Sequence, residues 1–305
     1  MPLEIHLAAI GILDGTAPGE IYVDDPGHPQ SCLAHTSRRF FLSGAGHNPA
    51  FNYGLRELFL NSFYPRAVAA GEEAFSLFYA SSGWENAIEG ILLGKYPLKT
   101  RREYYELKAV QPGRGQRQAP GGFEIRPVDA ALLSQAGLNN LDRLGAEIVS
   151  ECPSVQAFLD TRFGFCAIKE RDIAGWCLSE FNRDGRCEVG IETVEQFQRQ
   201  GIGTALTRVL AEHARLIGIS RIGWHCYASN VPSAATAVAA GFERIREYNA
   251  FLAFTDEAAA LAAHGNACFH DRRYAEAASW YIRSMQTGRA PDWVGQNLEK
   301  AKKHI

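Results

Sequence analysis

The 305-residue sequence has little net charge and no block of like charges. It contains 31 lysines and arginines against 34 aspartates and glutamates, a net charge of −3, which argues against a nucleic-acid-binding protein. No apolar run approaches the length of a membrane span, about 18 residues. The first residues also lack the basic start of a signal peptide. We therefore expect a cytoplasmic protein that binds neither nucleic acid nor a membrane.

Ordered cysteine and histidine spacings are also missing. The seven cysteines are an odd number without a C-x-x-C pair, so no disulfide framework is indicated. The nine histidines are scattered without ligand spacing, and we expect no metal. The apolar fraction of 46% is ordinary for a globular chain, and the length is sufficient for two domains with their own cores.

The strongest local signals lie between residues 187 and 242. Alternation of Val189, Ile191 and Thr193 with residues of the other face predicts a strand over 188–193. The pattern Q-x-x-G-x-G follows at Gln198–Gly203. Apolar residues at three- and four-residue spacings then predict a helix from residue 202 that stops at Gly218, with Thr207 on its solvent face.

Glycines at a helix start can form a cradle for an anion. Their N–H groups point one way, and no side chain blocks the approach of a ligand. The third glycine of a dinucleotide fingerprint is absent, because Leu206 takes its place, and no Lys-Ser or Lys-Thr follows as in a nucleotide P-loop. A tight strand-to-helix connection is the alternative interpretation of these glycines.

The order of the following elements narrows the choice. A predicted strand over 221–227 is followed by Asn230, Ser233 and a Gly-Phe pair ending at Phe242. This order resembles the GNAT N-acetyltransferase superfamily, whose splayed fourth and fifth strands hold the pantetheine arm of acetyl-CoA and whose Q-x-x-G-x-G turn binds the pyrophosphate. The strand 188–193, the Trp224 strand and Asn230-x-x-Ser233 look most like the zwittermicin-resistance type. The resemblance covers residues 123–254 and is weaker in the first hundred.

We interpret the chain as an α/β (α+β) protein with tandem GNAT-like halves, because the predicted order of elements in the first half recurs in the second. Each half has a mixed, mostly antiparallel sheet flanked by helices. A degenerate domain is predicted at residues 1–110, a linker rich in glycine and proline at 111–122, and the catalytic domain at 123–254. Residues 255–305 resemble a single tetratricopeptide repeat with a third, capping helix. One repeat cannot bury a core alone, so we expect this tail to dock on the catalytic domain or on a partner chain.

The equivalent turn of the first half is predicted to have lost its site. Residues 43–49 contain glycines before a helix but not Q-x-x-G-x-G, and Pro49 removes one N–H donor. We therefore expect one CoA site per chain. Asp24, Asp25 and His28 are interpreted as turn residues, with lining of the acceptor pocket as the alternative.

The resemblance also assigns the CoA-binding residues. It implies that the N–H groups of Thr193 and Val194 polarise the thioester carbonyl, and that the turn, the helix start and the Arg199 cation face the pyrophosphate. Asn230 is expected to bind the pantetheine arm or to close its turn. The full predicted set comprises Thr193, Val194, Gln198, Arg199, Gln200, Gly201, Ile202, Gly203, Thr204, Asn230 and Ser233.

The general base of the superfamily lies on the fourth strand, at a position that corresponds to Cys187 or Glu188. Strict counting gives Cys187, whereas Glu188 requires a bulge or a one-residue slip, because neighbouring strand residues face opposite sides. We favour Glu188, since a carboxylate accepts a proton from an amine at neutral pH and a thiol is a poor base. The alternative role for Glu188 is a strand-end carboxylate paired with Arg186.

The tyrosine that usually protonates the thiolate is replaced by Ala237. This departure leaves Ser233, Tyr227, Cys226 or water as the acid, and Ser233 is equally consistent with a helix cap. Trp224 and His225 on the preceding strand are interpreted as a core tryptophan and a hydrogen-bonded strand histidine.

The acceptor pocket of the superfamily corresponds to residues 138–163, where Glu147, Asp160 and Arg162 are candidates and surface charge is the alternative for each. The sequence thus predicts an acetyl-CoA-dependent (or other acyl-CoA-dependent) N-acyltransferase acting on a small-molecule amine by direct attack in a ternary complex. The alternatives are a non-catalytic acyl-CoA sensor or scaffold, and acyl transfer to a protein or carrier-bound substrate. The helical tail is the predicted site for a protein partner or for a second copy of the chain.

Overall fold

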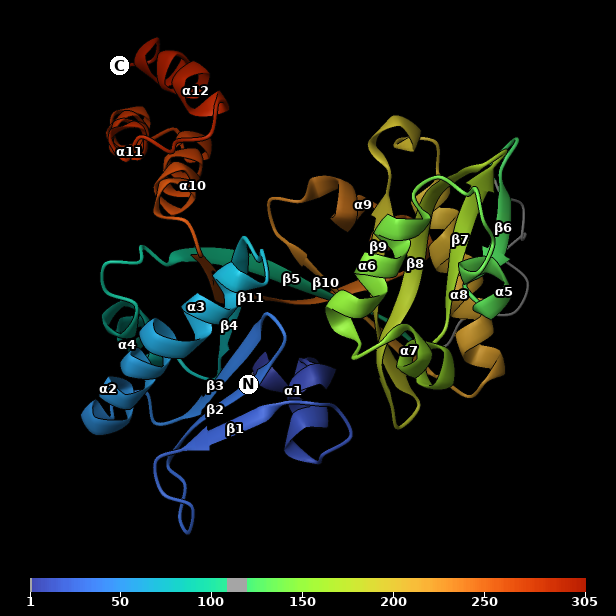
Figure 1. Cartoon of the computed structure of the whole chain (residues 1–305), viewed down its shortest axis with the longest axis horizontal. Coiled ribbons are helices and arrows are strands. Elements are labelled where there is room, and N and C mark those ends of the chain that lie inside the picture. The colour runs from blue at the N-terminus through green and yellow to red at the C-terminus, as the bar shows by residue number, and fades with distance from the viewer. Residues whose placement is uncertain (1, 109–119) are drawn as a thin grey trace. The chain divides into compact units, whose positions relative to one another are not determined.

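The computed structural model describes residues 2–108 and 120–305, so most of the predicted linker at 111–122 lies outside the described residues. The chain forms two compact units, shown with the element labels in Figure 1. Unit 1 contains residues 20–100 and 249–305, and unit 2 contains residues 4–19 and 101–248. These units differ from the predicted domain boundaries, because the N-terminal segment and most of β5 (Leu98–Lys108) belong to unit 2, whereas the end of β11 (Glu243–Phe254) belongs to unit 1.

Unit 1 is built on a sheet with the strand order β1-β2-β3-β4-β11. The neighbours β1 and β2, β2 and β3, and β4 and β11 are antiparallel, whereas β3 and β4 are parallel. A helical crossover joins the two parallel strands, and α4 follows β4. The elements are β1 (Glu20–Val23), β2 (Ser31–Thr36), β3 (Arg39–Gly44), α2 (Pro49–Leu58), the π-helical turn η2 (Phe59–Phe63), α3 (Tyr64–Ala69), β4 (Ala74–Tyr79) and α4 (Gly83–Ile91).

The core of unit 1 is mainly aromatic. The Phe40 ring contacts those of Phe59, Phe63 and Phe75, with centroids 4.8 to 5.1 Å apart. All four side chains are buried together with Trp84. Each buried aromatic ring removes a large apolar area from water, so this cluster stabilises the sheet against its helical crossover.

The C-terminal tail is helical, as predicted, and consists of α10 (Glu257–His270), α11 (Tyr274–Gln286) and α12 (Trp293–Lys302). A glycine permits α10 and α11 to cross closely, because a Cβ on Gly265 would lie 2.5 Å from Tyr281 Cδ1. Within unit 1, the tail contacts the first half of the sequence. His264 Nε2 lies 3.2 Å from the Tyr96 carbonyl, and the Arg283 guanidinium lies 5.0 Å above the Tyr96 ring.

Unit 2 has the strand order β11-β5-β10-β9-β8-β7-β6, in which β11 contributes only its first residues. Its neighbours are antiparallel in the pairs β10–β5, β6–β7, β7–β8 and β8–β9, whereas β9 and β10 are parallel and joined through α8. A hairpin followed by a parallel helical crossover therefore occurs in both units, as the tandem interpretation expects. The strands are β6 (Glu124–Pro127), β7 (Gly164–Lys169), β8 (Asp172–Arg183), β9 (Arg186–Thr193) and β10 (Arg221–Tyr227).

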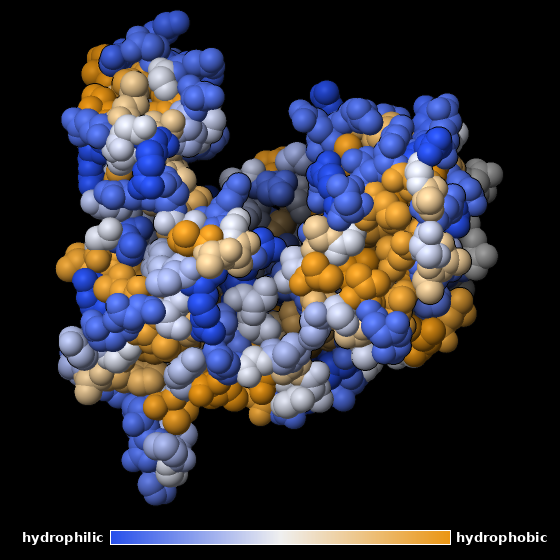
Figure 2. Space-filling model, viewed as in Figure 1, coloured by the Kyte–Doolittle hydropathy of each residue, from blue (hydrophilic) through white to orange (hydrophobic). Residues whose placement is uncertain are grey.

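Three helices of unit 2 begin at a residue whose side chain caps them. The side chains of Asp129, Ser154 and Asn230 accept N–H groups at the starts of α5, α7 and α9. Figure 2 shows hydrophobic side chains gathered over the face that carries α5–α7. The helices are α1 (Leu7–Leu13), preceded by the 3-10 turn η1 (Pro2–Ile5), α5 (Ala130–Leu133), α6 (Leu141–Glu151), α7 (Val155–Thr161), α8 (Ile202–Leu216) and α9 (Val231–Ala240).

Helix α8 packs against the sheet, but its buried stripe differs from the prediction: Ile217, expected to be buried, is 53% exposed. Thr207, expected on the solvent face, is buried with Leu206, Leu210 and Ala211. Its hydroxyl donates to the Gly203 carbonyl at 2.8 Å, so the buried polar atom is satisfied. The helix ends before Gly218, which has a φ of 87° and is suited to terminate it.

Candidate active site

Strands β9 and β10 separate towards one end of unit 2. Within the described residues, their parallel pairing joins only Arg186–Glu188 to Arg221–Gly223. β9 nevertheless continues to Thr193, and β10 continues to Tyr227 with its other edge paired to β5. The backbone N–H groups over residues 189–193 that face β10 therefore lie outside the β9–β10 ladder, as the predicted splay requires, and are candidates to contact a ligand.

The Q-x-x-G-x-G turn lies just beyond the end of β9. Gln198, which follows the 3-10 turn η3 (Glu195–Phe197), donates its side-chain N–H to the Thr193 carbonyl at 3.1 Å. Arg199 and Gly201 both adopt positive φ, 59° and 78°, before α8 begins at Ile202. Such closely spaced left-handed residues turn successive N–H groups to one side, so the segment is suited to hold an anion.

The two glycines leave room for such an anion. A Cβ on Gly201 would approach Pro120 Cγ at 3.9 Å. On Gly203 it would lie 3.3 Å from Thr236 Cγ2 and 3.4 Å from Ile191 Cδ1. The surroundings are side chains and not backbone, and the left-handed φ of Gly201 explains the need for glycine there. This geometry fits the pyrophosphate of CoA.

The predicted thioester-polarising amides need one correction. The Val194 N–H donates to the Ala174 carbonyl at 2.9 Å, across the ladder from β8, and is not available to an acyl group. Thr193 lies opposite Gly175 in that ladder. Because an antiparallel ladder alternates, the Thr193 N–H points away from β8 and towards β10. Thr193 therefore remains the candidate amide.

Three other predicted CoA-binding residues lie around the turn. The Gln200 side chain donates to the Gln196 carbonyl at 3.5 Å, Arg199 is exposed, and the partly buried Thr204 lies in the first turn of α8. Each is within the segment that surrounds the helix start, and their contacts to CoA stay predictions.

The predicted acid and arm-binding residues meet at the start of α9. Asn230 caps the helix, accepting the Ser233 N–H at 3.1 Å, which is the turn-closing role named among its alternatives. Ser233 Oγ accepts the indole N–H of Trp224 at 3.1 Å and does not act as the helix cap. Ala237, in the place of the usual tyrosine, is fully buried and offers no proton. Ser233 is thus the hydroxyl of this helix start that remains a candidate acid.

Cys187 and Glu188 project to opposite faces of β9. Cys187 is buried in the core cluster that includes Leu206 and Leu210 of α8. Burial raises the pKa of the Cys187 thiol, so it stays protonated at neutral pH. Glu188 lies on the other face, and its carboxylate Oε1 accepts the Leu7 N–H of α1 at 2.5 Å. The geometry therefore favours Glu188 over Cys187 as a proton acceptor.

Glu188 is only 2% exposed and lies in a polar cluster. Its Oε1 is 3.7 Å from His225 Nε2 on β10. The same His225 nitrogen lies 3.1 Å from the Ile5 carbonyl, and Nδ1 lies 2.9 Å from the Tyr248 hydroxyl. Arg186, the alternative partner for Glu188, donates instead to the Glu4 carbonyl at 3.4 Å. His225 therefore contacts the candidate base, a role beyond the strand histidine predicted from the sequence.

His6, Glu188 and His225 also place one potential metal-ligand atom each within 4.8 Å of one another. The two imidazole rings, however, stack with an interplanar angle of 11° and centroids 4.6 Å apart. A metal ion binds in the plane of an imidazole, along the nitrogen lone pair, and cannot lie in two stacked planes at once. In addition, a carbonyl partner requires a proton on His225 Nε2, which then has no lone pair for a metal. This arrangement fits a hydrogen-bonded cluster better than a metal centre.

The predicted acceptor-pocket residue Glu147 and the carboxylate of Glu180 both lie near Gly190 of β9. A Cβ on Gly190 of β9 would collide with Glu180 Oε1 and would lie 3.8 Å from Glu147 Oε1. Gly190 thus leaves space over the sheet that the Glu180 side chain occupies. Both carboxylates lie on the same face of β9 as Glu188, because residues 188 and 190 share that face.

Arg162 and Asp160, the other two acceptor-pocket candidates, are separated. Arg162 lines a cavity of about 280 Å³ together with Leu7, Thr16 and Asn182, and its guanidinium lies 5.0 Å above the Phe181 ring. Asp160 instead accepts the Gln156 side-chain N–H on the exposed side of α7. The cavity reaches Leu7, whose N–H contacts Glu188, so it is the candidate acceptor space on this face of unit 2.

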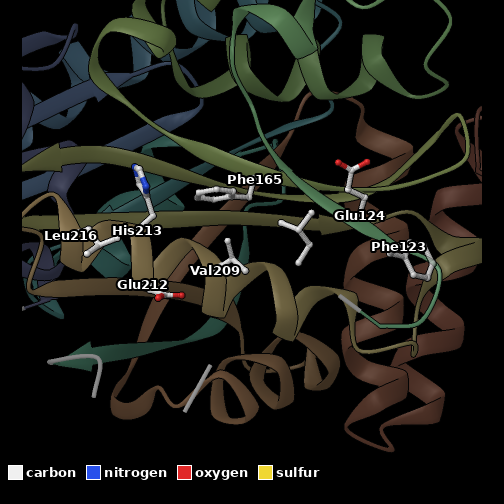
Figure 3. Close-up of a pocket in the computed structure, with 8 residues that line it drawn as sticks. Phe123, Glu124, Phe165, Val209, Glu212, His213 and Leu216 are labelled. Carbon is white, nitrogen blue, oxygen red and sulfur yellow. The ribbon is translucent and has the colours of Figure 1, made fainter. Parts of the chain in front are cut away.

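Another cavity, of about 440 Å³, lies between α8 and the strands β6 and β7 (Figure 3). It is lined by Val209, Glu212 and His213 of α8 and by Phe123 and Phe165. His213 packs between aromatic rings there, 5.5 Å from that of Phe165. The cavity does not include the glycine turn or Glu188, so we assign it no part in the site.

The N-terminal contribution to this site is not indicated by the sequence. Ile5, His6 and Leu7 all contact the pair formed by Glu188 and His225. These residues are distant in sequence from β9, and no local pattern signals such a pairing. Tyr248, in the middle of the last strand, was not indicated for the same reason.

The comparisons with known proteins agree with this geometry. A family model for GNAT acetyltransferases matches residues 6–251 of the chain. The match begins at His6 and spans both halves, beyond the 123–254 range of the predicted resemblance. The chain is also 26% identical over 242 residues to YdfB, an uncharacterized N-acetyltransferase of Bacillus subtilis (strain 168), covering 79% of this chain and 87% of the relative.

Solved structures support the fold. A GCN5-related N-acetyltransferase-like protein from Streptococcus suis 89/1591 matches with a TM-score of 0.58 and 20% identity, covering 83% of this chain and 93% of that chain. A GCN5-related N-acetyltransferase from Kribbella flavida matches with a TM-score of 0.51 and 14% identity, covering 83% and 95%. Among the described residues, no helix is both long and apolar enough to cross a membrane.

Proposed function

The chain belongs to the GNAT acetyltransferase family and is an N-acetyltransferase, and from this premise we propose that it transfers the acyl group of acetyl-CoA to the amine of a small molecule. The amine attacks directly in a ternary complex. The observation that carries this proposal is the open turn at Gly201 and Gly203 next to strands that separate beyond Glu188. The co-substrate supplies the activated acyl group, and residues of unit 2 bind, orient and exchange protons with the reactants.

The CoA-binding role rests on backbone donors. The N–H groups of Gly201, Ile202 and Gly203 at the start of α8 are suited to the pyrophosphate, with the Arg199 cation beside them. The Thr193 N–H is the proposed donor to the thioester oxygen, where negative charge develops during attack. The Val194 N–H has no part in this assignment, because it donates to the Ala174 carbonyl of β8.

The proton transfers are assigned to Glu188 and Ser233. Glu188 Oε1 accepts a proton from the attacking amine, directly or through a water molecule. Ser233 Oγ accepts the Trp224 indole N–H, so the serine's own proton can be donated to the departing thiolate. Cys226, an alternative acid, is buried with a raised pKa, and Tyr227 stacks on the Arg102 guanidinium at 4.4 Å. Ser233 or water is therefore the proposed acid.

The resemblance to particular acetyltransferases and to a tetratricopeptide repeat suggests the class of amine and the role of the tail. The zwittermicin-resistance likeness favours an antibiotic or another specialised metabolite as the amine. The helical tail, with its tetratricopeptide-like crossing at Gly265 and Tyr281, is proposed as a docking site for a protein partner or a second copy of the chain. Non-catalytic acyl-CoA sensing is the competing function, and Ala237 in place of the usual tyrosine is the observation that favours it.

A thiol-release assay tests the proposed reaction. The wild type is incubated with acetyl-CoA and a panel of small amines, and free CoA is measured against a reaction without amine. Glu188→Gln keeps the side-chain shape without its basicity, so we expect turnover to fall about 100-fold or more, with CoA affinity nearly unchanged. CoA binding without thiol release from any amine would support the sensor alternative.

Cys187→Ala is the control for the alternative register. Shortening this buried thiol should reduce the free energy of unfolding by roughly 1 kcal/mol. Turnover per folded molecule should stay close to that of the wild type. If Cys187→Ala is inactive while Glu188→Gln is active, the assignment of the base to Glu188 is wrong.

A further inference from the structure

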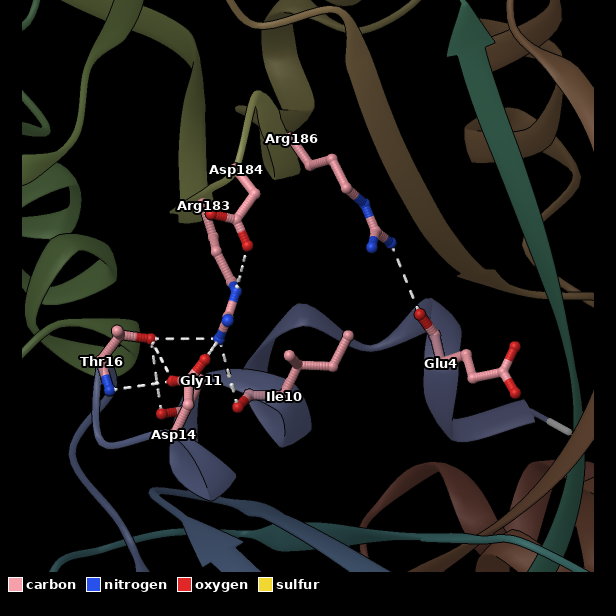
Figure 4. A network of polar contacts seen from close by, with 8 residues as sticks. All are labelled: Glu4, Ile10, Gly11, Asp14, Thr16, Arg183, Asp184 and Arg186. Carbon is pink, nitrogen blue, oxygen red and sulfur yellow. Dashed lines mark hydrogen bonds and ion pairs between the residues drawn. The ribbon is translucent and has the colours of Figure 1, made fainter.

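The N-terminal segment is held against the β8–β9 hairpin by a polar network (Figure 4). Arg183 forms an ion pair with Asp14, and its guanidinium also lies 3.4 Å from the Ile10 carbonyl. Arg186, on the other side of the hairpin, donates to the Glu4 carbonyl. The two arginines thus fix both ends of the segment between residues 4 and 14.

Between these two anchors, consecutive residues contact the Glu188–His225 pair. The Ile5 carbonyl lies 3.1 Å from His225 Nε2, and the His6 ring stacks on that of His225. The Leu7 N–H donates to Glu188 Oε1. One continuous stretch of backbone therefore contacts both members of the pair.

The hydrogen bonds define the protonation of His225. A carbonyl oxygen only accepts, so the contact with Ile5 requires a proton on Nε2. Glu188 Oε1 lies 3.7 Å from the same nitrogen. On its other side, His225 Nδ1 meets the Tyr248 hydroxyl, which accepts the Arg102 Nε–H at 3.2 Å.

A carboxylate as buried as Glu188 is stabilised as an anion only by nearby donors or cations. The Leu7 N–H supplies one donor, and the His225 N–H supplies a second polar contact. Leu7 also lines the cavity assigned to the acceptor, so the segment touches both the base and the substrate space.

We infer that the segment Ile5–Leu7 and His225 are positioning elements that hold Glu188 as an oriented carboxylate for proton transfer. This inference rests on the proposed function, because it concerns the same base. His225 acts through Glu188 and does not itself contact the reacting atoms. Truncating or displacing the first residues therefore disables the site in unit 2 even though the glycine turn stays intact.

The Leu7 N–H can be removed selectively. Leu7 is the first residue of α1, where proline is tolerated, and His6 before it has φ −99° and ψ 102°, an extended conformation compatible with a following proline. Leu7→Pro deletes the N–H, whereas Leu7→Ala shortens the side chain and keeps it. We expect Leu7→Pro to move the acidic limb of kcat/KM to higher pH by about 1 unit, because loss of a donor raises the pKa of Glu188. Leu7→Ala should leave the limb in place.

His225 is tested by a second pair of variants. His225→Ala removes the polar contact, whereas His225→Gln returns an N–H donor without an imidazole. We expect the acidic limb of His225→Ala to shift upward and that of His225→Gln to return towards the wild-type position. A merely structural role would lower the amount of active protein in both variants without moving the limb. An unchanged limb in Leu7→Pro and His225→Ala would therefore overturn the inference.

NMR spectra of the histidine rings test the pairing without any enzyme assay. The groups facing His225 are Glu188 from β9, His6 from the N-terminal segment, Tyr104 from β5 and Tyr248 from β11, with Arg102 behind Tyr248. Replacing the Glu188 carboxylate in Glu188→Gln should shift the ring NMR signals of His225.

Unchanged His225 ring signals in Glu188→Gln contradict the inference even if acyl transfer is demonstrated. Conversely, if no amine is acylated, the proposed function fails while shifted His225 signals still support the pairing. Loss of activity on chelation, with recovery on addition of zinc, would show that the cluster binds a metal and would also overturn the inference.

Discussion

The two units contain the same crossover, yet its parallel strands separate in just one of them. In unit 1, β3 pairs with β4 from Arg39 to Leu42, and the Ala80 N–H still donates to the Leu42 carbonyl at 2.8 Å. In unit 2, the described pairing of β9 with β10 ends at Glu188, well before β9 ends at Thr193. A ligand can therefore reach backbone groups along β9 that have no counterpart along β3.

The glycine turns differ as well. In unit 1, a Cβ on Gly46 would lie 2.5 Å from the Gly83 carbonyl carbon and 2.7 Å from the Trp84 nitrogen. The Asp24 carboxylate accepts the Asn48 side-chain N–H in the same turn, at 2.8 Å. The chain's own backbone and a negative charge thus occupy the region that an anion would need. In unit 1, Gly46 is needed because any side chain there would collide with the backbone of residues 83 and 84. In unit 2, the glycines of the turn leave room for a ligand.

Gly201→Asp breaks the unit 2 turn and carries the largest expected effect. Gly201 has a φ of 78°, which disfavours a side chain, and a carboxylate there would repel phosphate. We expect the Kd for CoA to rise about 100-fold or more, measured by calorimetry on protein whose folding is checked by circular dichroism. Unchanged affinity in a folded variant would refute the pyrophosphate assignment.

Much of this turn was predictable from sequence because its signals are local. Residues 198–203 carry both the pattern and the conformational requirement, and the strand at 221–227 has the bounds that the apolar pattern predicts. Asn230 was recognised before a short helix for the same reason. Local turn chemistry and periodicity, with the resemblance that these residues carry, are thus sufficient to predict the turn that we propose for CoA binding.

The acceptor half of the site was less predictable because its contacts are distant in sequence. The Leu7 N–H meets Glu188, and Tyr248 meets His225, with nothing in the intervening chain to indicate either pair. Val194 was misassigned because a motif does not reveal which strand amides a neighbouring ladder uses. The boundaries of the two units were not predicted for the same reason. Which unit contains most of β5 and which contains the end of β11 depends on tertiary packing.

A reciprocal pair of alanine variants sharpens the contrast between the turns. In Gly46→Ala the new Cβ meets backbone, so we expect the free energy of unfolding to fall by about 1–3 kcal/mol with CoA affinity unchanged. In Gly203→Ala the Cβ meets movable side chains, so stability should hold while CoA affinity falls by about tenfold. Thermal melting and calorimetry measure the two quantities on each variant. Equal losses of affinity would show that unit 1 also contributes to CoA binding.

Asp24→Asn has the smallest expected effect and tests the charge in the unit 1 turn. Backbone N–H groups, Ser31 first and then Gln30 and Asp25, hold the pKa of Asp24 below its ordinary value of 3.8. A lowered folded-state pKa means that the native chain binds fewer protons than the unfolded chain, so this group contributes stability above about pH 4 that is lost as the pH falls further. Asp24→Asn should therefore flatten the fall of Tm with pH in that acid range, and it should leave the stoichiometry at one CoA per chain, because backbone still fills the turn around Gly46. If titration yields a second CoA site in the variant, the charge of Asp24, and not packing around Gly46, is what prevents the unit 1 turn from binding CoA.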